Sequence, residues 1–146
     1  MTGIIIALIS GALMSIQGVF NTGVTKQTSL WVANSFVQFT GFLLCLLIWI
    51  IKERDHSMVT LLKVEPKYLL LGGLIGAGIT MTVIQSMDRL GPAKAVMLIV
   101  ISQIIIAYLI ELFGLFGVEK VPFQWSKLIG AGITIIGIIV FKFQSS

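Results

Sequence analysis

The sequence predicts an all-α membrane protein with five transmembrane helices, and three observations lead to that fold class. Hydrophobic residues make up 57% of the 146 residues and charged residues only 11%, with a mean hydropathy of +1.05, well above soluble domains. The apolar residues gather in five runs separated by short polar connections. These runs approach the roughly 20 residues that a helix needs to cross about 30 Å of hydrocarbon, where no water satisfies the backbone.

The five runs form one predicted transmembrane domain over residues 1–146. They lie at about residues 3–20, 31–51, 68–87, 95–116 and 128–141. No Lys or Arg precedes the first run and no soluble domain follows it, so we interpret it as a retained helix rather than a secretory signal. The fifth run spans only about 21 Å, and we expect Lys127 and Lys142 to reach outward to the headgroups and lengthen it.

The ends of the middle runs carry residues typical of membrane interfaces and turns. Trp31 and Trp49 flank the second run, as aromatic residues do at the two membrane surfaces. Gly91 and Pro92 predict the turn between the third and fourth runs.

The basic residues are distributed over every connection and form no stripe, so we interpret them as topology determinants and expect no nucleic-acid partner. One face of the membrane would receive Lys52, Arg54, Lys63, Lys67, Lys120 and Lys127, and the other Lys26, Arg89, Lys94 and Lys142. Six against four is a weak bias, which predicts that the chain can insert in both orientations. The alternative is that this modest excess holds the six-residue face and the amino terminus in the cytoplasm.

The segment LIGAGIT occurs twice, at residues 74–80 and 128–134. Glycine and threonine four residues apart share one helical face, and small residues there let two helices approach closely in lipid. In the fifth run this face comprises Gly130, Thr134 and Gly137, which we predict to form a subunit interface.

Amide side chains interrupt four of the runs. They are Gln17, Asn21, Asn34, Gln38, Gln85 and Gln103. Helical spacing places them on one polar stripe per helix, with Gly78 and Thr82 beside Gln85. An amide facing lipid leaves donors and acceptors unpaired at a cost of several kcal/mol. The stripes should therefore meet each other or water, either as a solute path or simply as hydrogen bonds that join helices.

Glu111 is the one acid within an apolar run. About 10 Å separates it from the end of the uncharged stretch at Val118, and Gln103 lies a similar rise further in, which places the two around the bilayer midplane. No Lys or Arg within the runs is positioned to pair with it, so the carboxyl should be neutral, hydrated or matched by a ligand. This favours a titrating group or a cation site, the alternative being a carboxylate at a helix end that reaches the headgroups.

Other chemistry is not indicated. Cys45 is the single cysteine and lies within a predicted span, so there is no disulfide framework. His56 is also alone, and we expect it to be solvated rather than a metal ligand. No nucleophile has a base at a workable spacing, so we expect neither an enzyme nor a cofactor.

The layout and several segments resemble one family. They are IQGVFNTGVTKQTSLWVANSF in the first connection, LGPAKA and SQIIIAYLIELFGLFGV in the fourth run, and KLIGAGITIIGIIV in the fifth. The chain resembles the half-size, five-span YdcZ-type branch of the drug/metabolite transporter superfamily. The resemblance implies a multi-pass protein of the bacterial inner membrane that acts in pairs, and it implies an aspartate where this chain has Glu111. No substrate follows from it.

An odd number of spans gives two copies joined head to tail opposite orientations, as in many transporters with inverted repeats. We therefore expect an antiparallel homodimer of ten helices whose polar stripes and Glu111 line a central cavity. The expected function is secondary-active transport, as an exporter, of a small polar or cationic metabolite or drug, coupled to protons or a cation by alternating access. The alternatives are a passive channel and an accessory subunit of a heteromeric transporter, paired with a related five-span chain.

Overall fold

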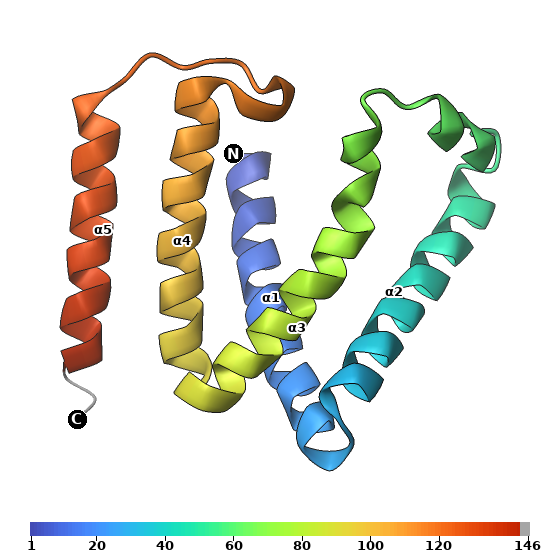
Figure 1. Ribbon diagram of the computed structural model, residues 1–146, viewed down its shortest axis with the longest axis horizontal. Helices are drawn as coiled ribbons and strands as arrows, with labels where there is room; N and C mark the ends of the chain where they lie inside the picture. The colour runs from blue at the N-terminus through green and yellow to red at the C-terminus, as the bar shows by residue number, and fades with distance from the viewer. Residues whose placement is uncertain (144–146) are drawn as a thin grey trace. The chain divides into compact units, whose positions relative to one another are not determined.

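The computed structural model describes residues 1–143, which are helical apart from short connections (Figure 1). The elements are α1 (Thr2–Gln27), α2 (Leu30–Lys52), η1 (Met58–Lys63), η2 (Lys67–Leu71), α3 (Gly72–Leu90), α4 (Pro92–Phe113), η3 (Leu115–Gly117) and α5 (Trp125–Phe143). By length and composition, α1, α2, α4 and α3 with its η2 lead can each cross a membrane, while α5 is a shorter apolar helix. The all-helical expectation is confirmed for the described residues. The side chain of Lys142, expected to reach the headgroups, lies outside the described part.

The chain divides into two compact units, one from Met1 to Pro92 and one from Ala93 onward. The first contains α1, α2 and α3, and the second contains α4 and α5. Each unit is described by itself.

Helix α1 runs seven residues beyond the predicted end of the first span. It stops at Thr28, whose backbone N–H donates to the carbonyl oxygens of Val24 and Thr25. The next residue, Ser29, already caps α2 by accepting a hydrogen bond from the Val32 N–H at 3.3 Å. Only two residues therefore join the helices, and most of the predicted first loop is helical, with Asn21 and Thr22 buried.

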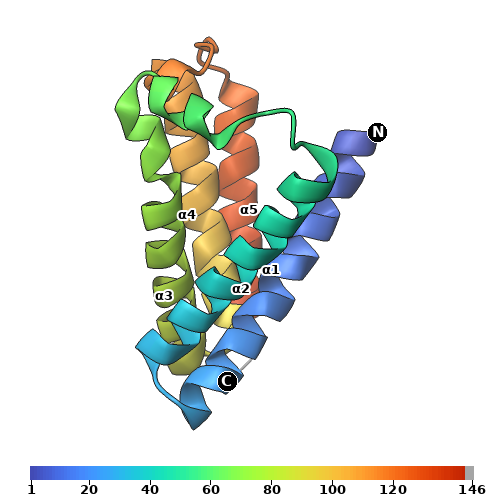
Figure 2. The same ribbon diagram turned by 90° about the vertical axis from the view of Figure 1, so that its right-hand side faces the viewer.

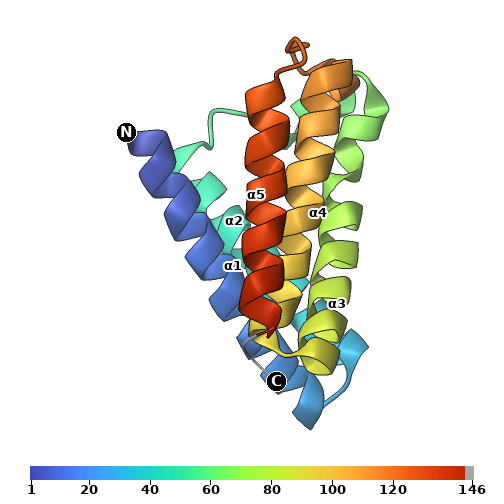
Figure 3. The ribbon, with the colours of Figure 1, turned by 90° about the vertical axis from the view of Figure 1, so that its left-hand side faces the viewer.

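The three helices of the first unit converge near the α1–α2 turn. The buried residues of the unit are Gly18, Asn21, Thr22, Ala33, Asn34, Ile84 and Met87. They come from the last third of α1, the start of α2 and the second half of α3. Toward their other ends, α1 and α2 lean away from α3, as Figures 2 and 3 show from opposite sides. The unit is therefore tightly packed at one end and spread at the other.

Gly18 sets the closest approach of α1 to α3. A Cβ atom at this position would lie 2.5 Å from the Met87 methyl carbon, 2.6 Å from its sulfur and 3.2 Å from a Val83 methyl. Since real side chains do not approach so closely, the present contact of Met87 with the α1 backbone depends on the absence of a side chain at residue 18.

In the second unit, α4 and α5 run side by side and antiparallel (Figures 1 and 3). Helix α4 ends at Gly114, a left-handed residue (φ 65°) of the kind that commonly terminates helices. This end lies earlier than the predicted residue 116, because Gly114 and Gly117 turn the chain. The connection then returns to α4, where the Val121 N–H donates to the Glu111 carbonyl oxygen at 3.0 Å.

Filling the space at Gly18 should separate α1 from α3. We predict that Gly18→Leu lowers the free energy of unfolding by about 1–3 kcal/mol, the usual cost of overpacking. Gly18→Ala should cost less, because the displaced atoms belong to the flexible Met87 side chain. The measurement is thermal unfolding of purified protein in detergent.

Gly11→Leu is the matched control, since nothing lies within 4 Å of a Cβ atom at that position of the same helix. Adding Met87→Ala to Gly18→Leu should restore part of the loss. Equal stability of the Gly18→Leu and Gly11→Leu variants would contradict this account of the packing.

Candidate functional site

The first unit contains a group of polar contacts, here called the amide crossing, where α2 meets α3 at Asn34 and Gln38. The Asn34 side chain is 5% exposed, and its Nδ2 donates to the Ala77 carbonyl oxygen at 3.1 Å. The Gln38 Nε2 donates to the Thr80 hydroxyl oxygen at 3.1 Å, and that hydroxyl in turn donates to the Gly76 carbonyl oxygen. Both predicted amides of α2 therefore face α3.

The amide crossing lies well inside both helices. Gln38 is eight residues from the start of α2, and Thr80 is eight residues from the start of α3. At 1.5 Å per residue, each lies about 12 Å along its helix. The Gln38–Thr80 hydrogen bond is thus placed at a depth where lipid would offer no partner for either side chain.

The predicted polar stripe of α3 does not face α2. Thr82 and Gln85 are exposed, and the Thr82 hydroxyl donates within its own helix to the carbonyl oxygens of Gly78 and Ile79. Ile84 and Met87 bury the opposite side of α3, and at 100° per residue Ala77 and Thr80 belong to that side. Gln85 therefore does not face α2 within this unit, because apolar packing sets the rotation of the helix, and its place on a polar path stays a prediction.

The two amides of α1 have different surroundings. Asn21 is 7% exposed and packed among the three helices. Gln17 is exposed. Both border a shallow hollow of about 410 Å³ lined by Leu13, Met14, Ile16, Gln17, Phe20 and Asn21. Asn21 therefore connects the packed end of the unit with the open surface beside Gln17.

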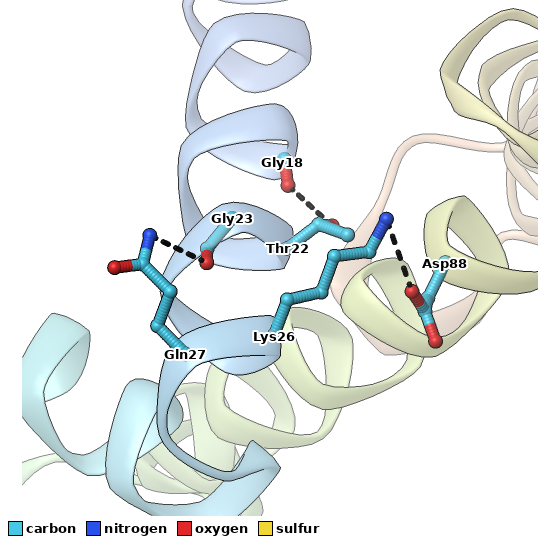
Figure 4. A network of polar contacts seen from close by, with 6 residues as sticks. All are labelled: Gly18, Thr22, Gly23, Lys26, Gln27 and Asp88. Carbon is cyan, nitrogen blue, oxygen red and sulfur yellow. Dashed lines mark hydrogen bonds and ion pairs between the residues drawn. The ribbon is translucent and has the colours of Figure 1, made fainter.

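An ion pair joins α1 to α3 at the packed end of the first unit. The Lys26 Nζ lies 3.6 Å from the Asp88 Oδ1 and joins the end of α1 to the end of α3 (Figure 4). The same view shows Thr22 donating to the Gly18 carbonyl oxygen at 2.8 Å, one turn away. The two side chains are 65% and 49% exposed, so the pair contributes at most about 1 kcal/mol. No sequence spacing predicts it, because the two residues are 62 positions apart.

In the second unit, Glu111 has a basic partner. Its Oε2 accepts a hydrogen bond from the Lys127 Nζ at 2.8 Å, and the side chains are 44% and 39% exposed. The expectation that no basic residue pairs with Glu111 is wrong. It failed because α5 begins at Trp125, three residues before the predicted span, so that Lys127 lies in the first helical turn and its ammonium reaches the Glu111 carboxylate on α4.

Glu111 also lies closer to a helix end than the sequence suggested. It is two residues from the end of α4 at Phe113, so about 3 Å along the axis, because the chain turns at Gly114. Gln103 is ten residues from that end and thus near the middle of α4, about 12 Å from Glu111 along the helix. Gln103 is exposed. Of this predicted pair, only Gln103 is near the helix centre.

Glu111 and Lys127 border a second hollow, here called the α4–α5 hollow, of about 410 Å³. It is lined by Ile104, Ala107, Tyr108, Glu111, Lys127, Gly130, Ala131 and Thr134. Gly130 and Thr134, predicted as a subunit interface, are thus turned toward α4, and the Thr134 hydroxyl donates to the Gly130 carbonyl oxygen at 2.9 Å. The α4–α5 hollow exists because the residues that face each other there, Ala107 on α4 and the small residues of α5, do not fill the gap. The Glu111–Lys127 pair lies at one end of it. Gly137 is exposed on α5.

Comparison with known proteins gives one match. The family model described as "Putative inner membrane exporter, YdcZ" matches residues 2–140, nearly the whole chain. No curated protein and no solved structure matches the chain. The family match and the apolar helices together make this a multi-pass protein of the inner membrane with a role in transport.

Proposed function

Since the chain belongs to the YdcZ family of inner-membrane exporters, we propose that it exports a small polar or cationic solute by secondary-active transport, as a pair of inverted copies. The observation that carries the proposal is the amide crossing, whose Gln38–Thr80 hydrogen bond joins α2 to α3 well inside both helices. Helix joining alone is the competing role, at about 0.6 to 2 kcal/mol per hydrogen bond. The first unit is packed at one end and spread at the other, and this asymmetry favours a solute path.

A unit closed at one end and spread at the other is what alternating access requires of each state. Gly18 and Met87 close the packed end, and the Lys26–Asp88 ion pair lies beside them. From the amide crossing, α2 and α3 diverge toward the α2–α3 connection (Figure 2). The amides thus lie where a solute entering from the spread end would meet the closed end.

The small number of buried residues supports assembly of two copies. Among the described residues, the apolar side chains that are buried are only Ala33, Ile84, Met87 and Ala95. In lipid, helices associate through close packing rather than through hydrophobic exclusion from water. A chain with so little internal packing gains it from a second chain, and the odd number of predicted spans, with the weak charge bias, allows that chain to be an inverted copy.

The Glu111–Lys127 pair supplies a switchable charge for coupling. At 2.8 Å the carboxylate and the ammonium neutralise each other, yet both side chains remain partly open to solvent. A proton that binds Glu111 removes its charge and frees Lys127, and a cationic solute competes for the carboxylate in the same way. The α4–α5 hollow beside the pair offers room for this exchange. A coupling role explains why a charged pair is placed against an apolar hollow.

We predict that Glu111→Gln abolishes coupled transport and leaves the fold intact, because the amide cannot exchange a proton while a partly exposed ion pair adds at most about 1 kcal/mol of stability. The measurement uses proteoliposomes containing a pH-sensitive dye, to which a panel of small cations including choline is added. Wild-type protein should move protons against the added cation, with saturation and counterflow, as a passive channel would not.

Glu119→Gln is the matched control, because Glu119 is an exposed acid in the connection that follows α4. It should transport like the wild type. Coupled flux in the Glu111→Gln variant equal to that of the Glu119→Gln variant would contradict the coupling role, and saturable but proton-independent flux in the wild type would contradict coupling altogether.

The inverted pair makes a prediction about topology. Reporters that are active on only one side of the membrane, fused in turn to each terminus, should find both termini on both sides. The reason is that the six-to-four distribution of basic residues does not fix one orientation. A single orientation for every copy would contradict the inverted homodimer and favour a heteromeric complex with a related chain.

A further inference from the structure

One oxygen atom in the amide crossing has no hydrogen-bond partner. The Asn34 Nδ2 donates to the Ala77 carbonyl oxygen, and a carbonyl can only accept, so this contact fixes which way the amide points. The Oδ1 is then directed elsewhere. It is shut off from solvent and accepts no hydrogen bond. Since Asn34 is 95% buried (5% exposed), this is a buried acceptor whose position is set by a second contact of the same side chain.

The polar side chains that form hydrogen bonds around the crossing direct them to other acceptors, and none of them donates to the Asn34 Oδ1. Thr22 donates to the Gly18 carbonyl oxygen, and Thr80 donates to the Gly76 carbonyl oxygen. Gln38 uses its amide on Thr80. A second oxygen of the same unit, the Thr25 Oγ1, is likewise buried without a partner. Because neither oxygen has a partner, the Thr25 hydroxyl does not donate to the Asn34 Oδ1.

Little holds the crossing closed over the Asn34 oxygen. The side-chain hydrogen bonds between α2 and α3 there are Asn34 to Ala77 and Gln38 to Thr80. Hydrogen bonds between helices in membrane proteins are individually weak, while a buried unpaired acceptor opposes the closed arrangement. A group that donates to the oxygen would remove this penalty. A ligand with an N–H or O–H donor would therefore favour separation of α2 from α3 by binding the Asn34 oxygen. A ligand without a donor would not.

We propose that the Asn34 Oδ1 is a binding contact for the transported solute, and that the solute must carry an N–H or O–H donor. The inference rests on the proposed transport function and adds a selectivity rule to it. Positive charge alone is not sufficient for binding. A quaternary ammonium without any donor is rejected, whereas an ammonium or a hydroxyl-bearing cation of similar size is accepted, because a site built around an unpaired acceptor discriminates strongly against ligands that leave it unpaired.

The test compares matched ligands on purified wild-type protein. Trimethylammonium, which has one N–H donor, is paired with tetramethylammonium, and choline with its methyl ether, so that the charge is kept and the donor is removed. Binding is measured from the ligand-dependent shift in thermal unfolding in detergent. We expect the donor-bearing member of at least one pair to bind about tenfold or more tightly than its partner. Because this comparison uses the wild type, it does not depend on the folding of any variant.

Three variants assign the contact to Asn34. Asn34→Leu removes the acceptor and should abolish the preference for donors. Asn34→Asp keeps an acceptor and loses the donor to Ala77, so the preference should survive. Thr40→Val is the matched control, because Thr40 is exposed on the same helix and its hydroxyl donates only to the carbonyl oxygens of Phe36 and Val37 within α2. If the role of Asn34 were only structural, Asn34→Asp and Asn34→Leu would behave alike.

Equal binding of both members of every pair, no binding by any donor-bearing ligand, or an unchanged preference in Asn34→Leu would overturn the inference. These results are distinguishable from failure of the proposed function. Coupled flux that depends on Glu111 but shows no preference for donors would overturn the selectivity rule and leave the transporter standing. Absence of coupled flux for every solute tested would overturn the proposed function itself.

Discussion

The structure depends on the inability of hydrocarbon to hydrogen bond. A polar side chain on these helices therefore needs a hydrogen-bond partner in its own helix, in a neighbouring helix or in water. Most hydroxyl groups solve the problem within their own helix, as Thr22, Thr82 and Thr134 do by donating to the carbonyl four residues earlier. Amides are too large and have too many donors and acceptors for that solution. They draw α2 against α3, and one of their oxygens remains unsatisfied.

Small residues have two opposite effects in this chain. In the first unit, Gly18 lets Met87 approach the α1 backbone, and the packed end of the three-helix group depends on that contact. In the second unit, Gly130 and Ala131 face Ala107, and the result is an open hollow rather than a close contact. The difference follows from what lies opposite. A long flexible side chain fills the space left by one glycine, whereas small residues facing each other leave room that a solute, a lipid or another helix can occupy.

The sequence was sufficient to predict the helical fold and the approximate positions of the helices, because apolar length is a strong constraint in membranes. It also identified Asn34 and Gln38 as residues that face another helix. It could not predict which side of α3 receives them, since the rotation of that helix is set by the packing of Ile84 and Met87 against its neighbours. The Glu111–Lys127 pair was missed for a similar reason. Helix α5 starts three residues earlier than predicted, and the chain turns at Gly114. Together these two features bring Lys127 to Glu111.

The central claim is that the amide crossing borders a watered path rather than a dry contact between helices, and thiol accessibility tests it most directly. In a Cys45→Ser background, Gln38→Cys and Phe36→Cys would be compared in intact membranes with a water-soluble thiol reagent. Both positions are exposed on α2, but they point to different sides of the helix. The account predicts rapid modification at residue 38 and slow modification at residue 36. Modification at residue 38 as slow as at residue 36 would contradict it, because both side chains would then lie in lipid or in dry protein.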